Sequence, residues 1–346
     1  MTRTIIFSLL VVLFSCRKDG EDPAGNKKAL WIEHAFQTLN SGNYPRVKAV
    51  SWWHENFDHS RLRIDSSPES LEAYRSGVAN PLFLTAPVFS GNKLSEPSSG
   101  IYHAAFPDFG GTEDVVTAQR ISDFETVAGK AIVWAYFSNN WYDTIMFPAE
   151  AVATIHAAGK VPFIRLMPRS NFEEGGPDPR YTMQRIIDGD FDTELNRWAT
   201  EAAQTGTKLL AEFGTEVNGD WFPWNGSYNG GGETSGYGDP SLPDGPERFR
   251  DAYRHIIDIC RANGADNITW FFHVDAYSQP DFAWNAVENY YPGDDYIDWL
   301  GVSIYGPQET GDDYQEFEEI LNDIYPALTG LSDKPLAILE FGITEM

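Results

Sequence analysis

Short apolar runs alternate with amphipathic stretches along most of this chain. Seven runs after residue 100 predict strands, at 101–106, 131–137, 161–167, 208–214, 268–274, 297–305 and 336–341. Their near-continuous apolar character is typical of parallel strands that are buried on both faces. Between them, helical spacing of apolar positions predicts helices at 113–128, 148–158, 192–205, 246–263 and 314–328. This alternation indicates an α/β fold built on a parallel sheet.

An eighth strand is predicted ahead of these seven. Residues 27–40 have a helical pattern, residues 46–53 have a strand pattern, and 67–77 is a predicted helix with Ser67 as its N-cap and Pro68 in its first turn. Eight strands are the number that a closed (β/α)8 or TIM barrel requires.

The order of these elements is unusual for such a barrel. It runs helix, strand, helix and then ends on a strand, so we interpret the chain as circularly permuted, with the usual last helix–strand unit at the N-terminus. The alternative is a chain truncated after Met346 that carries an unrelated N-terminal extension. No change of composition marks a second domain, and residues 27–346 are expected to form a single domain.

The first 26 residues have the pattern of an export signal. Arg3 precedes an apolar run over 5–14, which is too short to span a bilayer and leads into Leu13-Phe14-Ser15-Cys16. This ending resembles a bacterial lipoprotein signal, which implies a signal peptide over 1–16, lipidation of Cys16 and a polar tether over 17–26. We therefore expect a lipid-anchored protein at the bacterial outer membrane or cell surface, with the periplasmic face as an alternative. An ordinary signal peptide with a chance cysteine is the other interpretation.

Charge and aromatic content narrow the choice of partner. The chain has 25 basic and 51 acidic residues, so nucleic acid is not expected as a partner. It also has 11 Trp, 16 Tyr and 22 Phe, and several stand beside Asn, Asp or Gly, among them Trp141, Trp221 and Trp224. Flat aromatic faces next to hydrogen-bonding groups suit sugar rings. We expect a monomer that binds a β-linked polysaccharide or oligosaccharide.

Two glutamates stand at the ends of predicted strands. Glu216 follows the strand at 208–214, and Glu340 lies in the strand at 336–341. In a (β/α)8 barrel the carboxyl ends of all strands meet at the face that holds the active site. Two carboxyl groups facing each other there could act as the acid/base and the nucleophile of a retaining glycosidase. Each glutamate could also be structural, bonded to backbone amides or to an arginine.

Several motifs together resemble glycoside hydrolase family 26, a clan A family of β-mannanases and related β-glucanases and β-xylanases. The stretch Phe213-Gly214-Thr215-Glu216-Val217-Asn218-Gly219-Asp220-Trp221 is similar to the acid/base loop of that family, and Leu339-Glu340-Phe341-Gly342 is similar to its nucleophile strand. Residues 29–32 and 47–53 resemble segments that normally follow the nucleophile, which agrees with a permutation.

The resemblance implies a role for individual residues. Glu216 would be the acid/base and Glu340 the nucleophile of an endo-acting retaining hydrolase of β-mannan or β-glucan. Trp221 would be a stacking platform, Tyr305 would donate a hydrogen bond to Glu340, and Trp53 would line the cleft. The mannanases usually have His before the acid/base, whereas this chain has Thr215, which favours a glucan or xylan.

Other candidates keep a structural alternative. Arg165 could hold a carboxylate or a sugar hydroxyl, or form an ion pair at the top of the barrel. His273 could contact substrate or be a buried structural histidine. Neither a cofactor nor a metal ion is implied. The competing hypothesis for the whole chain is a carbohydrate-binding lipoprotein that has lost catalysis, although such a protein would be expected to have lost at least one of the two glutamates.

Overall fold

A computed structural model of the protein describes residues 27–57, 59–309 and 311–345. The expected signal peptide, Cys16 and the tether at 17–26 lie outside the described residues. Eight parallel strands form the central sheet: β1 (Val47–Trp53), β7 (Ile101–Phe106), β8 (Trp134–Asn140), β9 (Val161–Met167), β10 (Leu209–Phe213), β11 (Ile268–Asp275), β12 (Trp299–Tyr305) and β13 (Leu336–Gly342). Most positions in these strands are buried, as expected for a sheet covered on both faces.

Strand β1 closes the sheet into a barrel. It pairs in parallel with β13 on one side and with β7 on the other, so that Val50 lies opposite both Ile338 and His103. The ring order is therefore β1, β13, β12, β11, β10, β9, β8, β7 and back to β1. The predicted (β/α)8 barrel is confirmed, and β1 is one of its eight strands.

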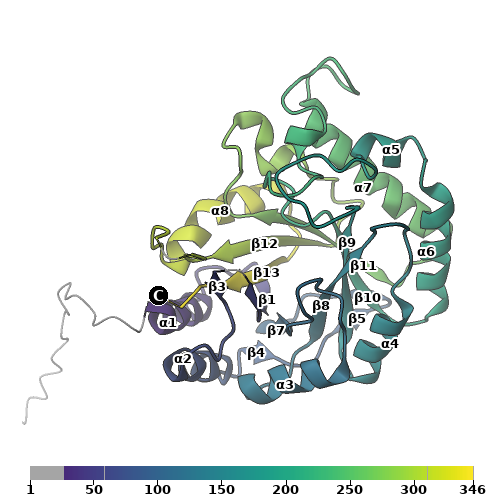
Figure 1. Ribbon diagram of the computed structural model, residues 1–346. Coiled ribbons are helices and arrows are strands. Elements are labelled where there is room, and N and C mark those ends of the chain that lie inside the picture. Colours follow the sequence, from purple (N-terminus) through teal and green to yellow (C-terminus); the bar gives the residue numbers. More distant parts are fainter. Residues whose placement is uncertain (1–26, 58, 310, 346) are drawn as a thin grey trace, which may run out of the picture.

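Helices surround the barrel (Figure 1). They are α1 (Lys27–Asn40), α2 (Pro68–Val78), α3 (Ala118–Ala128), α4 (Ala149–Ala157), α5 (Met183–Ile187), α6 (Asp192–Gln204), α7 (Asp244–Ala262) and α8 (Phe317–Leu331). Helix α1 packs against α2 and α8, which places it in the position between β13 and β1. Closure by the N-terminal elements is what the permuted arrangement requires, whereas the permutation itself stays a prediction.

The remaining elements are short. Strands β2 (Asn56–Phe57) and β3 (Ser60–Arg61) form one antiparallel pair, β5 (Phe89–Ser90) and β6 (Lys93–Leu94) form another, and β4 (Phe83–Leu84) pairs with the start of β7. Between β11 and β12 the chain makes two 3-10 turns, Ala283–Asn285 and Val287–Asn289. Within the described part of the chain, no helix has the length and apolar character needed to cross a membrane.

Several element boundaries differ from the prediction; helix α8, for example, is Phe317–Leu331 rather than 314–328. The helix predicted from residue 113 begins at Ala118, because the Thr117 side chain accepts a hydrogen bond from the Arg120 amide (3.2 Å) and caps it there. The residues before it form a loop in which Glu113 has φ of 60°. Strand β8 begins at Trp134 rather than at 131 and continues to Asn140. The predicted cap at Ser67 is confirmed, since its side chain accepts from the Ser70 amide (3.2 Å).

Candidate active site

A cavity of about 580 Å³ opens at the carboxyl ends of the barrel strands. Nearly every strand, or the loop after it, contributes a side chain to its wall. The contributors include Trp53 from β1, Glu113 from the loop after β7, Arg165 from β9, Glu216 from the loop after β10, Asp275 from β11, Tyr305 from β12 and Glu340 from β13. The structure therefore brings both predicted carboxylates into one cavity.

Glu340 is held by a cation and a hydroxyl group. Arg165 Nη2 lies 3.2 Å from its Oε1, and the Tyr305 hydroxyl donates a 2.8 Å hydrogen bond to its Oε2. Burial raises the pKa of Glu340 to about 7, while the Arg165 guanidinium opposes that rise and the negative charge of Glu216 adds to it. Both direct contacts of this carboxyl group stabilise its ionised form.

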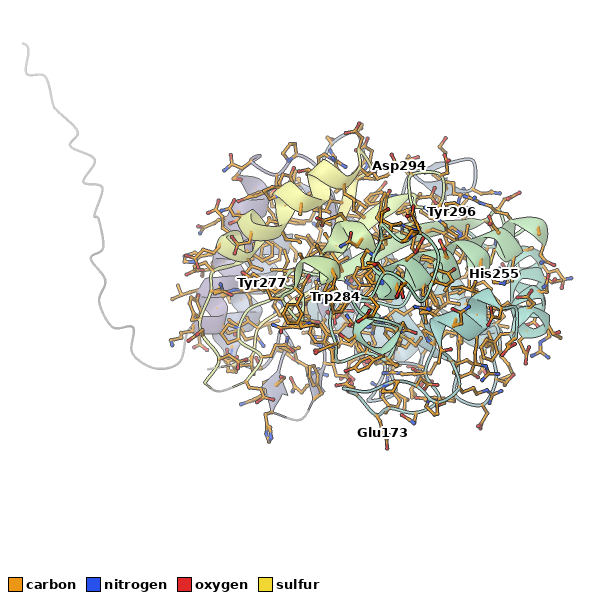
Figure 2. All side chains as sticks on the ribbon, turned by 90° about the horizontal axis from the view of Figure 1, so that it is seen from above. Glu173, His255, Tyr277, Trp284, Asp294 and Tyr296 are labelled. Carbon is orange, nitrogen blue, oxygen red and sulfur yellow. The ribbon has the colours of Figure 1, made fainter. Side chains whose placement is uncertain are left out.

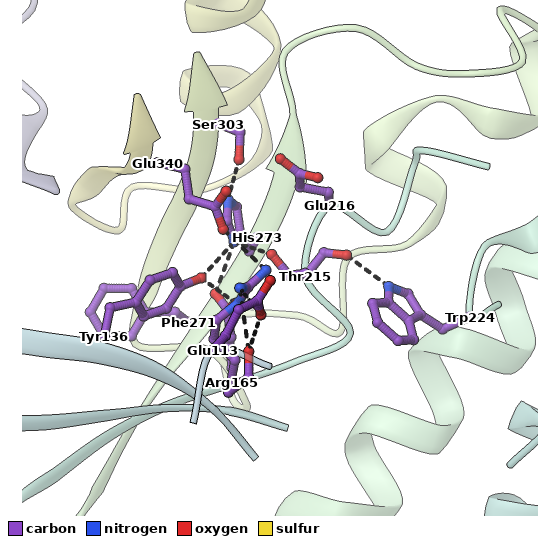
Figure 3. Close-up of polar contacts among 12 residues, drawn as sticks. Glu113, Tyr136, Arg165, Thr215, Glu216, Trp224, Phe271, His273, Ser303 and Glu340 are labelled. Carbon is purple, nitrogen blue, oxygen red and sulfur yellow. Dashed lines mark hydrogen bonds and ion pairs between the residues drawn. The ribbon is translucent and has the colours of Figure 1, made fainter. Parts of the chain in front are cut away.

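Glu216 has a different environment. It stands in the left-handed region with φ of 47°, directly after the strand end, and its side chain is buried at the cavity wall. The Trp221 indole donates a 2.9 Å hydrogen bond to its Oε2. Among the described residues, no cation lies within 4 Å of the Glu216 carboxyl group. Figure 3 shows Glu216 and Glu340 on either side of the same space.

Arg165 connects Glu340 to the lower part of the site. The buried guanidinium lies 2.9 Å from Glu113 and 3.5 Å from Glu212, in addition to its contact with Glu340. It also lies over the rings of Trp53 and Tyr136, at 4.9 and 5.1 Å from their centroids. Arg165 therefore lines the cavity and also forms the ion pairs at the top of the barrel.

A buried polar network lies beneath the two carboxylates (Figure 3). His273 Nδ1 is 2.9 Å from Glu212 and 2.7 Å from the Thr215 hydroxyl, and its Nε2 is 2.9 Å from the Ser303 hydroxyl. Burial is the largest single effect and lowers the pKa of His273, but the charge and hydrogen bond of Glu212, together with the charges of Glu340 and Glu216, raise the pKa overall. The expectation that His273 binds substrate is corrected, because His273 is fully enclosed and supports the residue next to Glu216 instead.

Two of the predicted sugar-binding tryptophans are also corrected. Trp141 is buried in edge-to-face contact with Tyr181 (5.2 Å), outside the cavity wall. Trp224 is fully buried, and its indole donates to the Thr215 carbonyl oxygen at 2.7 Å. Their neighbouring Asn and Gly residues suggested exposed rings that stack on sugars. Both rings are instead part of the buried core next to the site.

The other predicted aromatic residues line the cavity. Trp221 and Tyr305 are partly exposed there. Trp53 lines it as well, but Phe106 stacks on its ring at 4.0 Å and Arg165 lies over the ring too, so its faces are already occupied. Tyr277, in the segment after β11 that also carries Trp284 (Figure 2), lines the rim and donates to Asp323 of α8 at 3.1 Å.

Sequence reasoning missed three acidic residues of this site. Glu212 is fully buried and also accepts a hydrogen bond from Tyr136, and a charged residue inside the apolar run Leu209–Phe213 was the signal for it. Glu113 was placed in a helix, although it contacts Arg165 and lines the cavity. Glu55 lies beyond the end of β1 and had no distinguishing motif.

Residues 181–333 match the model of glycosyl hydrolase family 26. Endoglucanase H of Acetivibrio thermocellus is 26% identical over 73% of this chain and 26% of its own length. The β-1,3-xylanase TXYA of a Vibrio species is 24% identical over 37% of this chain and 23% of its own length. The mannan endo-1,4-β-mannosidase A and B of Caldalkalibacillus mannanilyticus is 28% identical over 42% and 24%, respectively. The chain thus spans about a quarter of the length of these curated relatives.

Solved structures of similar architecture include two mannanases. The Bacillus subtilis mannanase BCman has a TM-score of 0.46 and 14% identity over 93% of this chain and 78% of its own. A β-mannanase from Bacteroides ovatus has a TM-score of 0.43 and 14% identity over 90% and 76%. On the sequence matches, the chain is similar to glycosyl hydrolase family 26 over a segment that contains Glu216.

Proposed function

We propose that this protein is a retaining glycoside hydrolase in which Glu340 is the nucleophile and Glu216 the acid/base. The observation that carries the proposal is the unequal environment of two carboxyl groups in one cavity. Glu340 contacts the guanidinium of Arg165 and the hydroxyl of Tyr305, both of which favour a carboxylate. Glu216 accepts a hydrogen bond from the neutral indole of Trp221, and no cation among the described residues lies within 4 Å of its carboxyl group.

The proposed reaction has two steps, with Glu340 as the nucleophile and Glu216 as the acid/base. The Glu340 carboxylate attacks the anomeric carbon, and the C–O bond to the leaving sugar breaks as Glu216 donates its proton to the departing oxygen. Glu216 then removes a proton from a water molecule, whose oxygen attacks the same carbon and releases Glu340 as a carboxylate. Together, the two steps return the site to its starting protonation.

The substrate class that we propose is a β-linked polysaccharide, β-glucan or β-mannan, cleaved within the chain. The curated relatives are named for glucan, β-1,3-xylan and mannan hydrolysis. Thr215 occupies the position before the acid/base, but its hydroxyl is turned to His273 and is fully buried. It therefore offers no group to a sugar, which supports a glucan over a mannan.

Reducing-sugar release from mannan, mixed-linkage β-glucan, β-1,3-xylan and carboxymethylcellulose tests the proposal. We expect release from at least one of them, and loss of turnover with intact folding in Glu340→Ala. Added azide should restore part of the activity of a Glu216→Ala variant towards an aryl glycoside, since azide replaces the base-activated water. Glu288→Ala, at an exposed carboxyl outside the cavity, is the control. A wild type that binds these glycans but cleaves none would favour an inactive binding protein.

We also propose that the protein is anchored by lipid at Cys16 on the bacterial outer membrane or cell surface. The proposal rests on the apolar run and the Leu-Phe-Ser-Cys sequence. Cys16→Ala should move the protein from the membrane fraction to the soluble fraction. Cys260→Ala is the matched control, because Cys260 is a buried free thiol of helix α7. Membrane retention of the Cys16 variant would contradict the proposal.

A further inference from the structure

Glu55 is a buried acid at the wall of the cavity. It stands two residues after the last position of β1, is 6% exposed and lines the cavity next to Trp53, Phe57 and Gly111. Among the residues that the structure describes, no hydrogen bond or ion pair to its carboxyl group is found, and its oxygens are not among the enclosed polar atoms. The carboxyl group is therefore open to the cavity, where a bound molecule can provide a partner.

The charge state of Glu55 suits a neutral partner. Burial raises the pKa of Glu55 to about 8, and the carboxylates of Glu113 and Asp108 act in the same direction. Near neutral pH the group is therefore protonated, with one O–H donor and a carbonyl acceptor. A donor beside an acceptor complements a pair of sugar hydroxyl groups, each of which can both donate and accept.

The position of Glu55 in the barrel selects one side of the substrate. In the ring of strands, β1 is four places from β10 in either direction, so Glu55 lies on the wall opposite the loop that carries Glu216. The leaving oxygen must lie beside Glu216 to receive its proton, with the anomeric carbon within reach of Glu340. The ring that keeps this carbon then extends away from Glu216, towards the end of β1.

An aromatic ring follows Glu55 two residues later in the chain. Phe57 of β2 lines the same cavity and is 41% exposed, unlike the buried aromatic residues of the barrel. Apolar C–H faces of sugars pack on such rings while their hydroxyl groups reach neighbouring polar groups.

We propose that Glu55, with Phe57 beside it, binds the sugar on the non-leaving side of the cleaved bond and selects among sugars by the orientation of their hydroxyl groups. This inference rests on the proposed function and adds to it a specificity-determining residue. Sites that hydrogen-bond a substrate hydroxyl discriminate strongly, because an unsuitable sugar leaves the buried polar group unpaired.

The test uses 4-nitrophenyl β-cellobioside, β-mannobioside and β-xylobioside, in which every sugar lies on the non-leaving side. For the best substrate of the wild type, we expect Glu55→Leu to lower kcat/KM by about tenfold or more. Glu55→Gln, which keeps one donor and one acceptor, should retain activity within about threefold. The ratio of kcat/KM between the best and the poorest of the three glycosides should be smaller in Glu55→Leu than in the wild type.

Asp313→Asn is the matched control. Asp313 is an exposed carboxyl at the rim of the same cavity, so its loss changes the charge but removes no buried group. We expect it to lower kcat/KM much less than Glu55→Leu does and to leave the sugar preference unchanged.

Three results would overturn the inference: unchanged activity in Glu55→Leu, equal losses in the Leu and Gln variants, or the same loss in Asp313→Asn. Thermal unfolding of each variant separates a binding defect from a folding defect. A wild type that is inactive on every glycoside and every polysaccharide would instead contradict the proposed function.

Discussion

Arg165 and Tyr305 contact different oxygens of the Glu340 carboxyl group, so each can be tested separately at the scale of a residue. The Tyr305 hydroxyl is the simpler of the two, because Tyr305→Phe removes one donor and leaves the ring. Arg165 also contacts Glu113 and Glu212, and its loss would remove a cation from three carboxylates at once.

We expect Tyr305→Phe to move the acid limb of the kcat/KM–pH profile to higher pH. The donated hydrogen bond stabilises ionised Glu340, so its removal raises the pKa of Glu340 further above its ordinary value. In the wild type, kcat/KM should fall as pH decreases through about 7, where Glu340 takes up a proton. The variant should also lose about tenfold to a hundredfold in kcat.

Tyr277→Phe is the control for this profile. Tyr277 lines the same cavity, but its hydroxyl donates to Asp323 rather than to Glu340. If both variants shift the acid limb equally, or if neither does, the hydrogen bond from Tyr305 does not set the ionisation of Glu340.

The shared position of Glu216 and Glu340 could be predicted from sequence because the carboxyl ends of all strands in a (β/α)8 barrel meet at one face. The tryptophans could not be sorted in the same way. Trp221 and Trp224 belong to one polar segment, yet Trp221 contacts Glu216 and Trp224 is enclosed behind Thr215. The conformation of the whole loop decides which of the two rings faces the cavity, and this conformation cannot be predicted from the neighbouring residues alone.

At the scale of elements, hydrogen bonds join α1 to β3 and to the loop that follows it. Lys28 of α1 is fully buried, and the ammonium group donates to the carbonyl oxygens of Arg61 (2.5 Å) and Arg63 (2.8 Å) and to the Ser66 hydroxyl (2.8 Å). Burial lowers the pKa of Lys28 to about 7. One buried amine thus helps to hold helix α1 in its place between α8 and α2.

Lys28→Met should lower the free energy of unfolding by about 2–4 kcal/mol, because three acceptors lose their donor. Chemical denaturation measures this loss, and Lys27→Met, at the exposed neighbouring position, should change little. Between pH 7 and 10 the unfolded wild type binds more protons than the folded protein at this residue, so its stability rises with pH there. The gap between wild type and Lys28→Met should therefore widen from pH 6.5 to 9, and a constant gap would contradict the lowered pKa.

Most elements were predictable because their apolar periodicity is long and regular. Helix α1 and strand β1 lie within a residue of their predicted bounds. The sequence predicts the start of α3 too early, although Thr117 is a local cap as Ser67 is for α2. Residues 113–117 fit a helical pattern, and only the contact of Glu113 with the distant Arg165 shows that they form a loop.

For the whole molecule, the closed ring implies that the order of elements along the chain matters less than their neighbours in space. Figure 1 shows the C-terminal end beside α1, and Glu345 accepts hydrogen bonds from Ser66 (2.6 Å) and Ser70 of α2 (3.2 Å). A short connection could therefore join this end to Lys27.

We expect a rearranged chain that begins at Pro81, joins the C-terminal end to Lys27 through a short Gly-Ser linker and ends at Asn80 to form the same barrel. Its new ends fall between α2 and β4, outside any barrel strand. Circular dichroism and a single cooperative thermal transition would support this expectation, and retained hydrolysis would support it further. The same linker with new ends between Phe163 and Ile164, inside β9, is the control that should not fold.

The pairing of β1 with β13 has a consequence for how the protein is made. Of the eight barrel strands, β1 leaves the ribosome first and β13 last, so one edge of β1 stays unpaired until the other strands have been made, and contacts between such distant segments form slowly. The segment that finally covers this edge is also the one that carries Glu340. A chain interrupted before residue 336 would thus be both unclosed and without its proposed nucleophile, and hydrolytic activity would begin only in molecules whose synthesis had reached the last strand.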